Sequence, residues 1–303
     1  MTDRGSAVAE DDQQHGPDAP ASEKAAPAAA TKDGTDWWGE VKGIFWLILG
    51  VLAFHSFVAK PFYIPSESMM PILLKGDRLV VTKYPYGWSW VSPSFHVLPP
   101  SHGRLFGRMP ERGDIVILTP RGESSDYIKR VIGLPGDRLE MVGGQLYING
   151  QPVKRERRPA AMVPVDANVT CEADQNFDPE VTGPDGKLYC RLPVVRETLP
   201  NGRTYDTIDM GYSSVDDFAE LTVPKDQVFV MGDNRDRSAD SRVSRANQGL
   251  GGAVPWENIG GRAEFITFSL DGTSQYLNPI SWFTALRSGR AGTSLRPQEA
   301  EGK

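Results

Sequence analysis

The sequence contains few cysteines and histidines, and it has no excess of positive charge. Its 303 residues include two cysteines and four histidines, and the formal net charge is −6. Residues 1–42 hold four basic and nine acidic residues, which account for −5 of that charge, so the rest of the chain is close to neutral. A chain without a lysine- and arginine-rich face lacks the charge that neutralises phosphates. We therefore exclude nucleic acid as a partner.

The histidines are poorly placed for catalysis. His15 lies in the N-terminal tail, His55 in an apolar run, and His96 and His102 in a proline-rich stretch without an obvious acidic partner. A serine nucleophile most often relies on a histidine that an acid orients. The sequence therefore disfavours a serine–histidine triad.

No metal or cofactor is predicted. A loop starting at Asp236 has alternating oxygen-bearing side chains, but a calcium loop needs glycine where Ser241 stands and glutamate where Asn247 stands. Cys171 and Cys190 lack metal-ligand spacing and enclose a polar loop, in which a disulfide would stabilise the fold by about 3 kcal/mol. We predict this disulfide and an oxidising compartment, and two unpaired thiols are the alternative.

Long apolar runs are also scarce, and one stands out. Residues 43–59, GIFWLILGVLAFHSFVA, carry no formal charge between two lysines, and as a helix they would span about 26 Å. Flanking tryptophans and lysines extend this length across a bilayer. Phe57 stands where a cleavable leader needs a small residue. Residues 37–60 therefore predict an uncleaved transmembrane anchor, with a buried soluble helix as the alternative.

The rest of the chain predicts a mainly β fold, an antiparallel β-sheet body behind one N-terminal transmembrane helix. Short runs rich in valine, isoleucine and tyrosine, closed by glycine, proline or aspartate, predict strands. They lie at 78–84, 113–120, 126–134, 137–150 (a hairpin) and 226–234.

The predicted organisation follows from composition. Residues 1–36 contain no aromatic side chain and predict a disordered tail. We expect the β-rich body at 61–290, with a less typical inserted subdomain at about 140–225, and a flexible tail at 291–303. Aromatic stretches at 84–111 and 277–290 suit contact with a lipid bilayer, or ordinary packing.

A lysine is the alternative base for a serine. At a reference pKa near 10.4 a lysine is almost fully protonated at pH 7, so a lysine base must be buried among apolar neighbours. The segment YIKRVIG, 127–133, offers such a setting, because in a strand Lys129 shares a face with Tyr127 and Val131. A solvated lysine at a sheet edge is the alternative.

Four segments in order resemble the bacterial type I signal peptidases, membrane-anchored Ser/Lys proteases that remove signal peptides from exported proteins. They are PSESMMP with a following GD, then RGDIV, YIKRVIGLPGD and GDNRDRSADSR, and NPISWFTALR is similar to proteobacterial members. Glu67 stands where many relatives have glycine and Ile72 where threonine is common. The motifs fall roughly within residues 61–137 and 226–271, and the tail and two insertions, 84–111 and 150–225, lie outside the resemblance.

The resemblance implies a role for each matching residue. Ser68 would be the nucleophile and Lys129 the general base, while Ser66 would help to stabilise the oxyanion and Ser238 would orient the lysine. The resemblance also implies that Asp240 and Arg242 hold the loop that carries Ser238. A pocket for small side chains would be lined by Ile64, Pro65, Tyr127 and Ile128.

The implied activity is cleavage of preprotein signal peptides after Ala-x-Ala, with the substrate adding a strand to a sheet edge. One anchor implies a single-pass protein of the bacterial inner membrane, with a cytoplasmic tail and a periplasmic catalytic body. The alternatives are a self-cleaving Ser/Lys repressor and an anchored β domain that binds peptides or envelope partners without catalysis. A penicillin-binding type of enzyme is disfavoured because no S-x-x-K motif occurs.

Overall fold

The computed structural model describes residues 37–96, 98–123, 125–171 and 178–300. The predicted tail at 1–36 lies outside these residues. The chain divides into two compact units between Phe45 and Trp46, within helix α1 (Trp37–Phe57). In the described part of the chain, α1 is the one helix long and apolar enough to cross a membrane. The predicted helix is therefore present, with the expected start.

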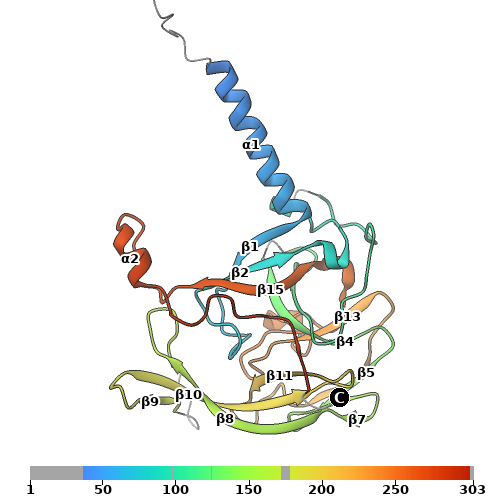
Figure 1. Ribbon diagram of the computed structural model, residues 1–303. Helices are drawn as coiled ribbons and strands as arrows, with labels where there is room; N and C mark the ends of the chain where they lie inside the picture. Colours follow the sequence, from blue (N-terminus) through green and yellow to red (C-terminus); the bar gives the residue numbers. More distant parts are fainter. Residues whose placement is uncertain (1–36, 97, 124, 172–177, 301–303) are drawn as a thin grey trace, which may run out of the picture. The chain divides into compact units, whose positions relative to one another are not determined.

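The unit that begins at Trp46 is built mainly from antiparallel β-sheets, which confirms the predicted fold class (Figure 1). Its largest sheet has seven strands in the order β1-β2-β15-β3-β4-β13-β14. The strands are β1 (Ala59–Tyr63), β2 (Asp77–Thr82), β3 (Ile115–Leu118), β4 (Tyr127–Gly133), β13 (Gln227–Met231), β14 (Val254–Pro255) and β15 (Ile259–Ser269).

Two smaller sheets come mainly from the region predicted as an inserted subdomain. One pairs β12-β5-β6-β7, and the other pairs β16-β11-β10-β8 with β9 beside β10. The strands are β5 (Arg138–Val142), β6 (Gln145–Ile148), β7 (Gln151–Pro152), β8 (Lys154–Pro164), β9 (Glu180–Thr182), β10 (Leu188–Thr198), β11 (Arg203–Ile208), β12 (Phe218–Thr222) and β16 (Gln298–Glu299). In Figure 1, β8, β10 and β11 form a layer apart from β2 and β15.

Each window predicted as a strand contains one. The predicted hairpin is formed by β5 and β6, whose turn residues Gly143 and Gly144 both have positive φ, at 52° and 79°. Such a turn favours glycine because a Cβ would be strained there. The long strands β8, β10 and β15 were not predicted. In β8 the charged residues occupy the consecutive positions 154–158, so no apolar alternation is visible there, and most of its residues are exposed.

Strand β4 is the element that carries the chemistry. Six of its seven residues are buried, because β3 pairs with one edge and packed side chains cover both faces. Ile128 joins one apolar cluster, with Ile64 and Leu79, and Val131 joins another, with Val116 and Val230. A polar side chain on this strand therefore has to lie inside the protein.

The prediction of a flexible tail at 291–303 is wrong for residues 291–300. Leu295 is 2% exposed and packs in the same cluster as Ile64 and Met69. Strand β16 then pairs with β11 through Thr204 and Gln298. The polar composition of this segment hid a single buried leucine and a backbone pairing, and the remaining residues, 301–303, lie outside the described part.

The two aromatic stretches contain little regular structure. The stretch at 84–111 holds the short helices η1 (Tyr84–Tyr86) and η2 (Ser94–His96), and it exposes Phe95 and Phe106. Trp88 donates its Nε1 hydrogen to the carbonyl of Phe57, which ties this stretch to the end of α1. The later stretch forms α2 (Pro279–Thr284), which leaves Phe283 74% exposed. Trp90, in contrast, is buried.

The two cysteines form a disulfide, with Cα atoms 5.5 Å apart. Cys190 lies in β10 and is buried in a cluster with Val163 and Leu192. The bridge closes the loop that begins at Cys171, so it links the start of that loop to strand β10.

Candidate active site

Lys129 and Ser68 are in direct contact. The Nζ of Lys129 donates a hydrogen bond to the Oγ of Ser68 at 2.8 Å, and both residues are about 95% buried or more. Lys129 reaches the site from β4, and Ser68 lies in the turn that follows β1. A lysine amine at this distance from a hydroxyl has the geometry of a base beside its nucleophile.

Burial changes the acidity of the lysine. The pKa of Lys129 is lowered to about 8, mainly by loss of solvent and to a smaller extent by the positive charge of Arg242, whereas the carboxylates of Asp240 and Asp233 oppose the shift. Its Nζ also lies 5.8 Å from the centre of the Tyr127 ring, as the shared strand face predicts. With a pKa near 8, about one lysine in four is neutral at pH 7.5.

Ser66 lies beside the nucleophile. The two hydroxyl oxygens of Ser66 and Ser68 are 3.3 Å apart, and Ser66 itself is exposed. A hydroxyl here can rotate toward solvent or toward a group bound at Ser68. The arrangement suits a donor that acts only when substrate is present.

The loop at 232–242 closes the other side of the site. The backbone N–H of Asn234 donates to the carbonyl of Ser68 at 3.1 Å. A Cβ added to Gly232 would lie 2.4 Å from that same carbonyl and 2.2 Å from the Oγ of Ser238, so only glycine fits between them. The loop and the nucleophile turn therefore pack backbone against backbone.

Asp240 and Arg242 hold this loop together. Asp240, with no exposed surface, accepts a hydrogen bond from the backbone of Gly232 at 2.9 Å and forms two more with the guanidinium of Arg242. Arg242 in turn donates to the carbonyl of Arg235 at 2.7 Å. Although burial acts in the opposite direction, the Arg242 charge and these hydrogen bonds lower the pKa of Asp240.

Ser238 is buried at the site, 5% exposed, but its Oγ has no hydrogen-bond partner among the described residues. The expected hydrogen bond to Lys129 is therefore not made in this arrangement. An unpaired buried hydroxyl is costly, which favours a partner during the reaction.

The residues predicted to line the pocket are two pairs that precede Ser68 and Lys129 in the chain. Ile64 and Ile128 are buried in one cluster, whereas Pro65 is exposed and Tyr127 is half-buried. Strand β3 pairs with one edge of β4 along residues 127–130, but β13 pairs with the other edge only from Arg130 onward. Among the described residues, the edge at 127–129 has no strand partner, so an extended peptide can bind there.

Two functional neighbours were not predicted. Arg130 and Asp233 form a buried pair with hydrogen bonds of 2.7 and 2.6 Å, immediately next to Lys129 and Gly232 in the sequence. Arg130 also donates to the carbonyl of Gly113. Arg130 lies in the YIKRVIGLPGD segment and Asp233 in the GDNRDRSADSR segment, but only the fold shows that the two residues meet.

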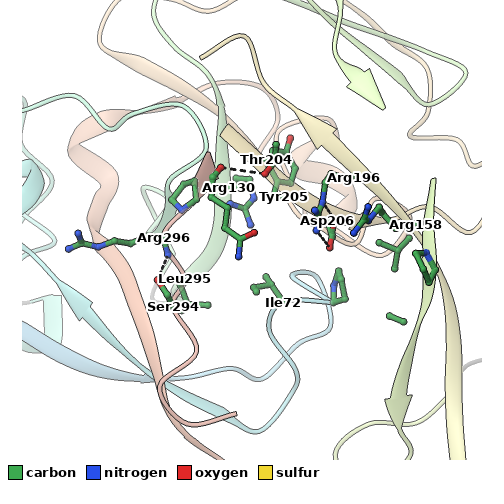
Figure 2. Close-up of a pocket in the computed structure, with 16 residues that line it drawn as sticks. Ile72, Arg130, Arg158, Arg196, Thr204, Tyr205, Asp206, Ser294, Leu295 and Arg296 are labelled. Carbon is green, nitrogen blue, oxygen red and sulfur yellow. Dashed lines mark hydrogen bonds and ion pairs between the residues drawn. The ribbon is translucent and has the colours of Figure 1, made fainter. Parts of the chain in front are cut away.

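A separate cavity of about 440 Å³ lies between the nucleophile turn and the inserted subdomain. Figure 2 shows Ile72 and Arg130 on its wall, with Arg196 paired to Asp206. Neither Ser68 nor Lys129 lines it. Among the described residues, no group of three or more histidine, cysteine, aspartate or glutamate side chains could hold a metal ion.

Comparison with known proteins identifies the family of this chain. The family model described as "Signal peptidase, peptidase S26" matches residues 37–268. A signal peptidase I of Rickettsia typhi is 37% identical over 239 residues, covering 76% of this chain and 80% of the relative. One of Rickettsia prowazekii is 37% identical over 233 residues, covering 72% and 75%.

A crystal structure of a signal peptidase I from Enterococcus faecalis V583 is 24% identical, covers 51% of this chain and 97% of its own, and has a TM-score of 0.27. The family match and the identity to the curated relatives over most of the chain establish the classification, as the sequence motifs predicted. The chain belongs to the signal peptidases of peptidase family S26 and is a serine endopeptidase.

Proposed function

We propose that this protein removes signal peptides from exported preproteins, cutting after small residues with Ser68 as nucleophile and Lys129 as general base. The observation that carries the proposal is the 2.8 Å contact between the Lys129 amine and the Ser68 hydroxyl inside the protein. The relatives are named signal peptidase I, which supplies the substrate class.

In the acylation step, the Oγ of Ser68 attacks the carbonyl carbon of the scissile bond while neutral Lys129 accepts the hydroxyl proton. The C–N bond then breaks, and the leaving amine of the mature protein takes that proton from the Nζ. In deacylation, Lys129 removes a proton from water, which attacks the ester on Ser68. The signal peptide leaves with a new carboxyl group, and the proton returns to the serine.

Charge that develops on the substrate oxygen needs donors. Two lie in reach of the reacting carbonyl, the backbone N–H of Ser68 and the Ser66 hydroxyl 3.3 Å from the nucleophile oxygen. The buried, unpaired hydroxyl of Ser238 is suited to orient the lysine amine once Ser68 has turned toward the substrate. A hydrogen-bond donor to the oxyanion typically accelerates the reaction by about 10²–10³-fold.

Specificity for small side chains follows from the proposed binding mode. The substrate extends along the unpaired edge of β4 at 127–129 and forms backbone hydrogen bonds there. Because alternate side chains of a strand point the same way, the residues one and three before the cut face the protein. The proposed pockets for these side chains are lined by Ile64, Pro65, Tyr127 and Ile128, and shallow pockets would favour Ala-x-Ala.

We further propose that α1 spans the bacterial inner membrane once, with residues 1–36 in the cytoplasm and the catalytic unit in the periplasm. The length and hydropathy of α1 support a single span, and the disulfide supports the oxidising side for the body. The lipid bilayer is then a second partner, beside the preprotein.

The test uses the full chain in detergent with a preprotein that carries an Ala-x-Ala site. Mass spectrometry identifies the new N-terminus, for wild type and for Ser68→Ala and Lys129→Ala. Ser213→Ala is the control, because it removes a buried serine hydroxyl that lies outside the site. Cleavage at the site by wild type and the control alone supports the proposal, whereas cleavage that survives both active-site substitutions rejects the dyad.

A further inference from the structure

We propose that Glu197, in the inserted subdomain, is a positioning residue for the active site and acts on it through Arg235. The proposal rests on the proposed function and deepens it, because it gives the inserted sheet a part in catalysis. Glu197 lies on β10 and has no exposed surface. It is far from Ser68 and Lys129 in the sequence, and it does not touch either of them in the hydrogen bonds of the structure.

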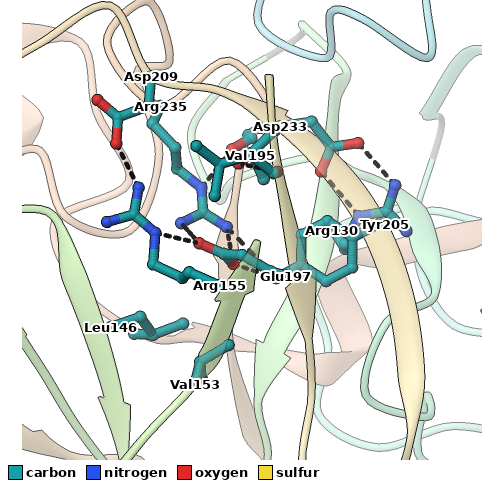
Figure 3. A network of polar contacts seen from close by, with 12 residues as sticks. Arg130, Leu146, Val153, Arg155, Val195, Glu197, Tyr205, Asp209, Asp233 and Arg235 are labelled. Atoms are coloured by element: carbon teal, nitrogen blue, oxygen red, sulfur yellow. Dashed lines mark hydrogen bonds and ion pairs between the residues drawn. The ribbon is translucent and has the colours of Figure 1, made fainter. Parts of the chain in front are cut away.

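Glu197 is the anion of a buried pair. Its two oxygens accept hydrogen bonds of 2.7 and 2.6 Å from the two terminal nitrogens of Arg235, and the hydroxyl of Tyr205 donates a third at 2.8 Å. Figure 3 shows Arg235 directed at Glu197, with Arg130 and Asp233 beside Tyr205. A two-pronged guanidinium–carboxylate contact fixes the direction of the arginine as well as its charge.

Arg235 fixes the start of the 232–242 loop from three sides. Its Nε donates to the carbonyl of Gly232 at 3.3 Å, and its backbone N–H donates to Ile208 of β11 at 3.0 Å. Its own carbonyl accepts the 2.7 Å hydrogen bond from Arg242. The residue that Glu197 holds is thus hydrogen-bonded to both ends of the loop, to Gly232 through its side chain and to Arg242 through its backbone carbonyl.

The segment held in this way is the one that contacts the nucleophile. Asn234 precedes Arg235 and donates its backbone N–H to the carbonyl of Ser68 at 3.1 Å. Gly232 packs so closely on that carbonyl that a Cβ would lie 2.4 Å from it. A shift of Arg235 therefore reaches the backbone of Ser68 through two contacts, without passing through the substrate pocket.

The alternative is that the pair only stabilises the inserted sheet. The chain offers a matched comparison, because Arg196, the neighbour of Glu197 on β10, forms a similar two-pronged pair with Asp206 of β11, with hydrogen bonds of 2.7 and 2.9 Å. Their side chains are partly exposed, and Asp206 makes no side-chain hydrogen bond to the 232–242 loop in the described structure. Glu197→Gln and Asp206→Asn each neutralise one such carboxylate.

The experiment measures kcat and KM of the full chain in detergent on a preprotein substrate. For Glu197→Gln we expect kcat to fall at least about tenfold with KM changed less than about twofold, since small misplacements of reacting groups cost up to about 100-fold. Asp206→Asn should retain both constants. Tyr205→Phe is the substitute test in case Glu197→Gln does not fold. It removes one hydrogen-bond donor to Glu197 and leaves the ion pair, so kcat should fall less while KM stays nearly constant.

A second measurement does not depend on activity. Hydrogen exchange followed by mass spectrometry should show faster exchange in peptides covering 232–238 for Glu197→Gln, and wild-type exchange there for Asp206→Asn. A folded Glu197→Gln protein with wild-type kcat and unchanged exchange overturns the positioning role, and so do equal losses in both variants. If the wild type does not cleave preproteins, the proposed function fails. The exchange result alone then shows whether Glu197 holds the 232–242 loop in place.

Discussion

The Nζ of Lys129 lies 2.8 Å from the Oγ of Ser68, although 61 positions separate the two residues in the chain. The contact forms because β4 is covered on both faces, so the lysine cannot reach water and points instead toward the turn after β1. The same burial brings the pKa of the amine to about 8, which makes it usable as a base.

Activity should rise with pH through this pKa. Below about pH 8 the Lys129 amine is protonated and cannot accept the serine proton, so kcat/KM should fall about tenfold for each pH unit. Above it the amine is neutral and the profile should level. A profile of kcat/KM from pH 5.5 to 9.5 checks this, and full activity at pH 6 would contradict a lysine base.

Asp240→Asn should move that inflection to lower pH. The Asp240 carboxylate raises the pKa of Lys129 and so opposes the effect of burial. Without this carboxylate the pKa of Lys129 should fall further. The variant also leaves Arg242 in the interior without its anion, and the fold should lose about 3–5 kcal/mol. The pH profile is measured below the melting temperature, with Asp206→Asn as the control whose inflection stays in place.

Ser66→Ala should lower kcat by about 10²–10³-fold and leave KM nearly constant, since the hydroxyl would act only on the developing oxyanion. Because Ser66 is exposed, the free energy of unfolding should change by less than about 0.5 kcal/mol. Steady-state kinetics and urea unfolding check both parts. Ser66→Thr retains a hydroxyl and should lose less, and equal losses in the two variants would argue against a donor role.

Replacing both cysteines with serine should destabilise the catalytic unit by about 3 kcal/mol, because the bridge spans 19 positions of chain. Urea unfolding of the double variant and the wild type measures the difference. The active site lies on other strands, so kcat should be unchanged at 25 °C. A protein of unchanged stability would mean that the bridge does not constrain the unfolded chain.

Leu295→Ala should cost about 2–5 kcal/mol in unfolding free energy, the usual loss for a buried leucine. Leu295 packs with Ile64 and Met69, on either side of Ser68 in the chain, so activity should also become more sensitive to temperature. Leu277→Ala, which alters a residue that is 89% exposed, is the control and should change stability by less than about 0.5 kcal/mol. Equal stability of the two variants would contradict the packed C-terminal segment.

Local patterns were enough for much of the fold. The uncharged run at 43–59 predicted α1, and the short runs of β-branched residues predicted β2, β3, β4, β13 and the β5–β6 hairpin. These signals depend on neighbouring residues alone. Strand β8 was missed because most of its residues are solvent-exposed, and because its partner β10 lies far along the chain.

By itself the sequence determined the family, the candidate dyad and the shared strand face of Tyr127 and Lys129, since motifs and a period of two are local properties. Only the tertiary structure decided that both faces of β4 are covered, that Ser238 is left without a partner, and that Leu295 belongs to the core. It also joined Glu197 to Arg235. Burial and ion pairing are set by which distant segments meet, and residue spacing does not specify that.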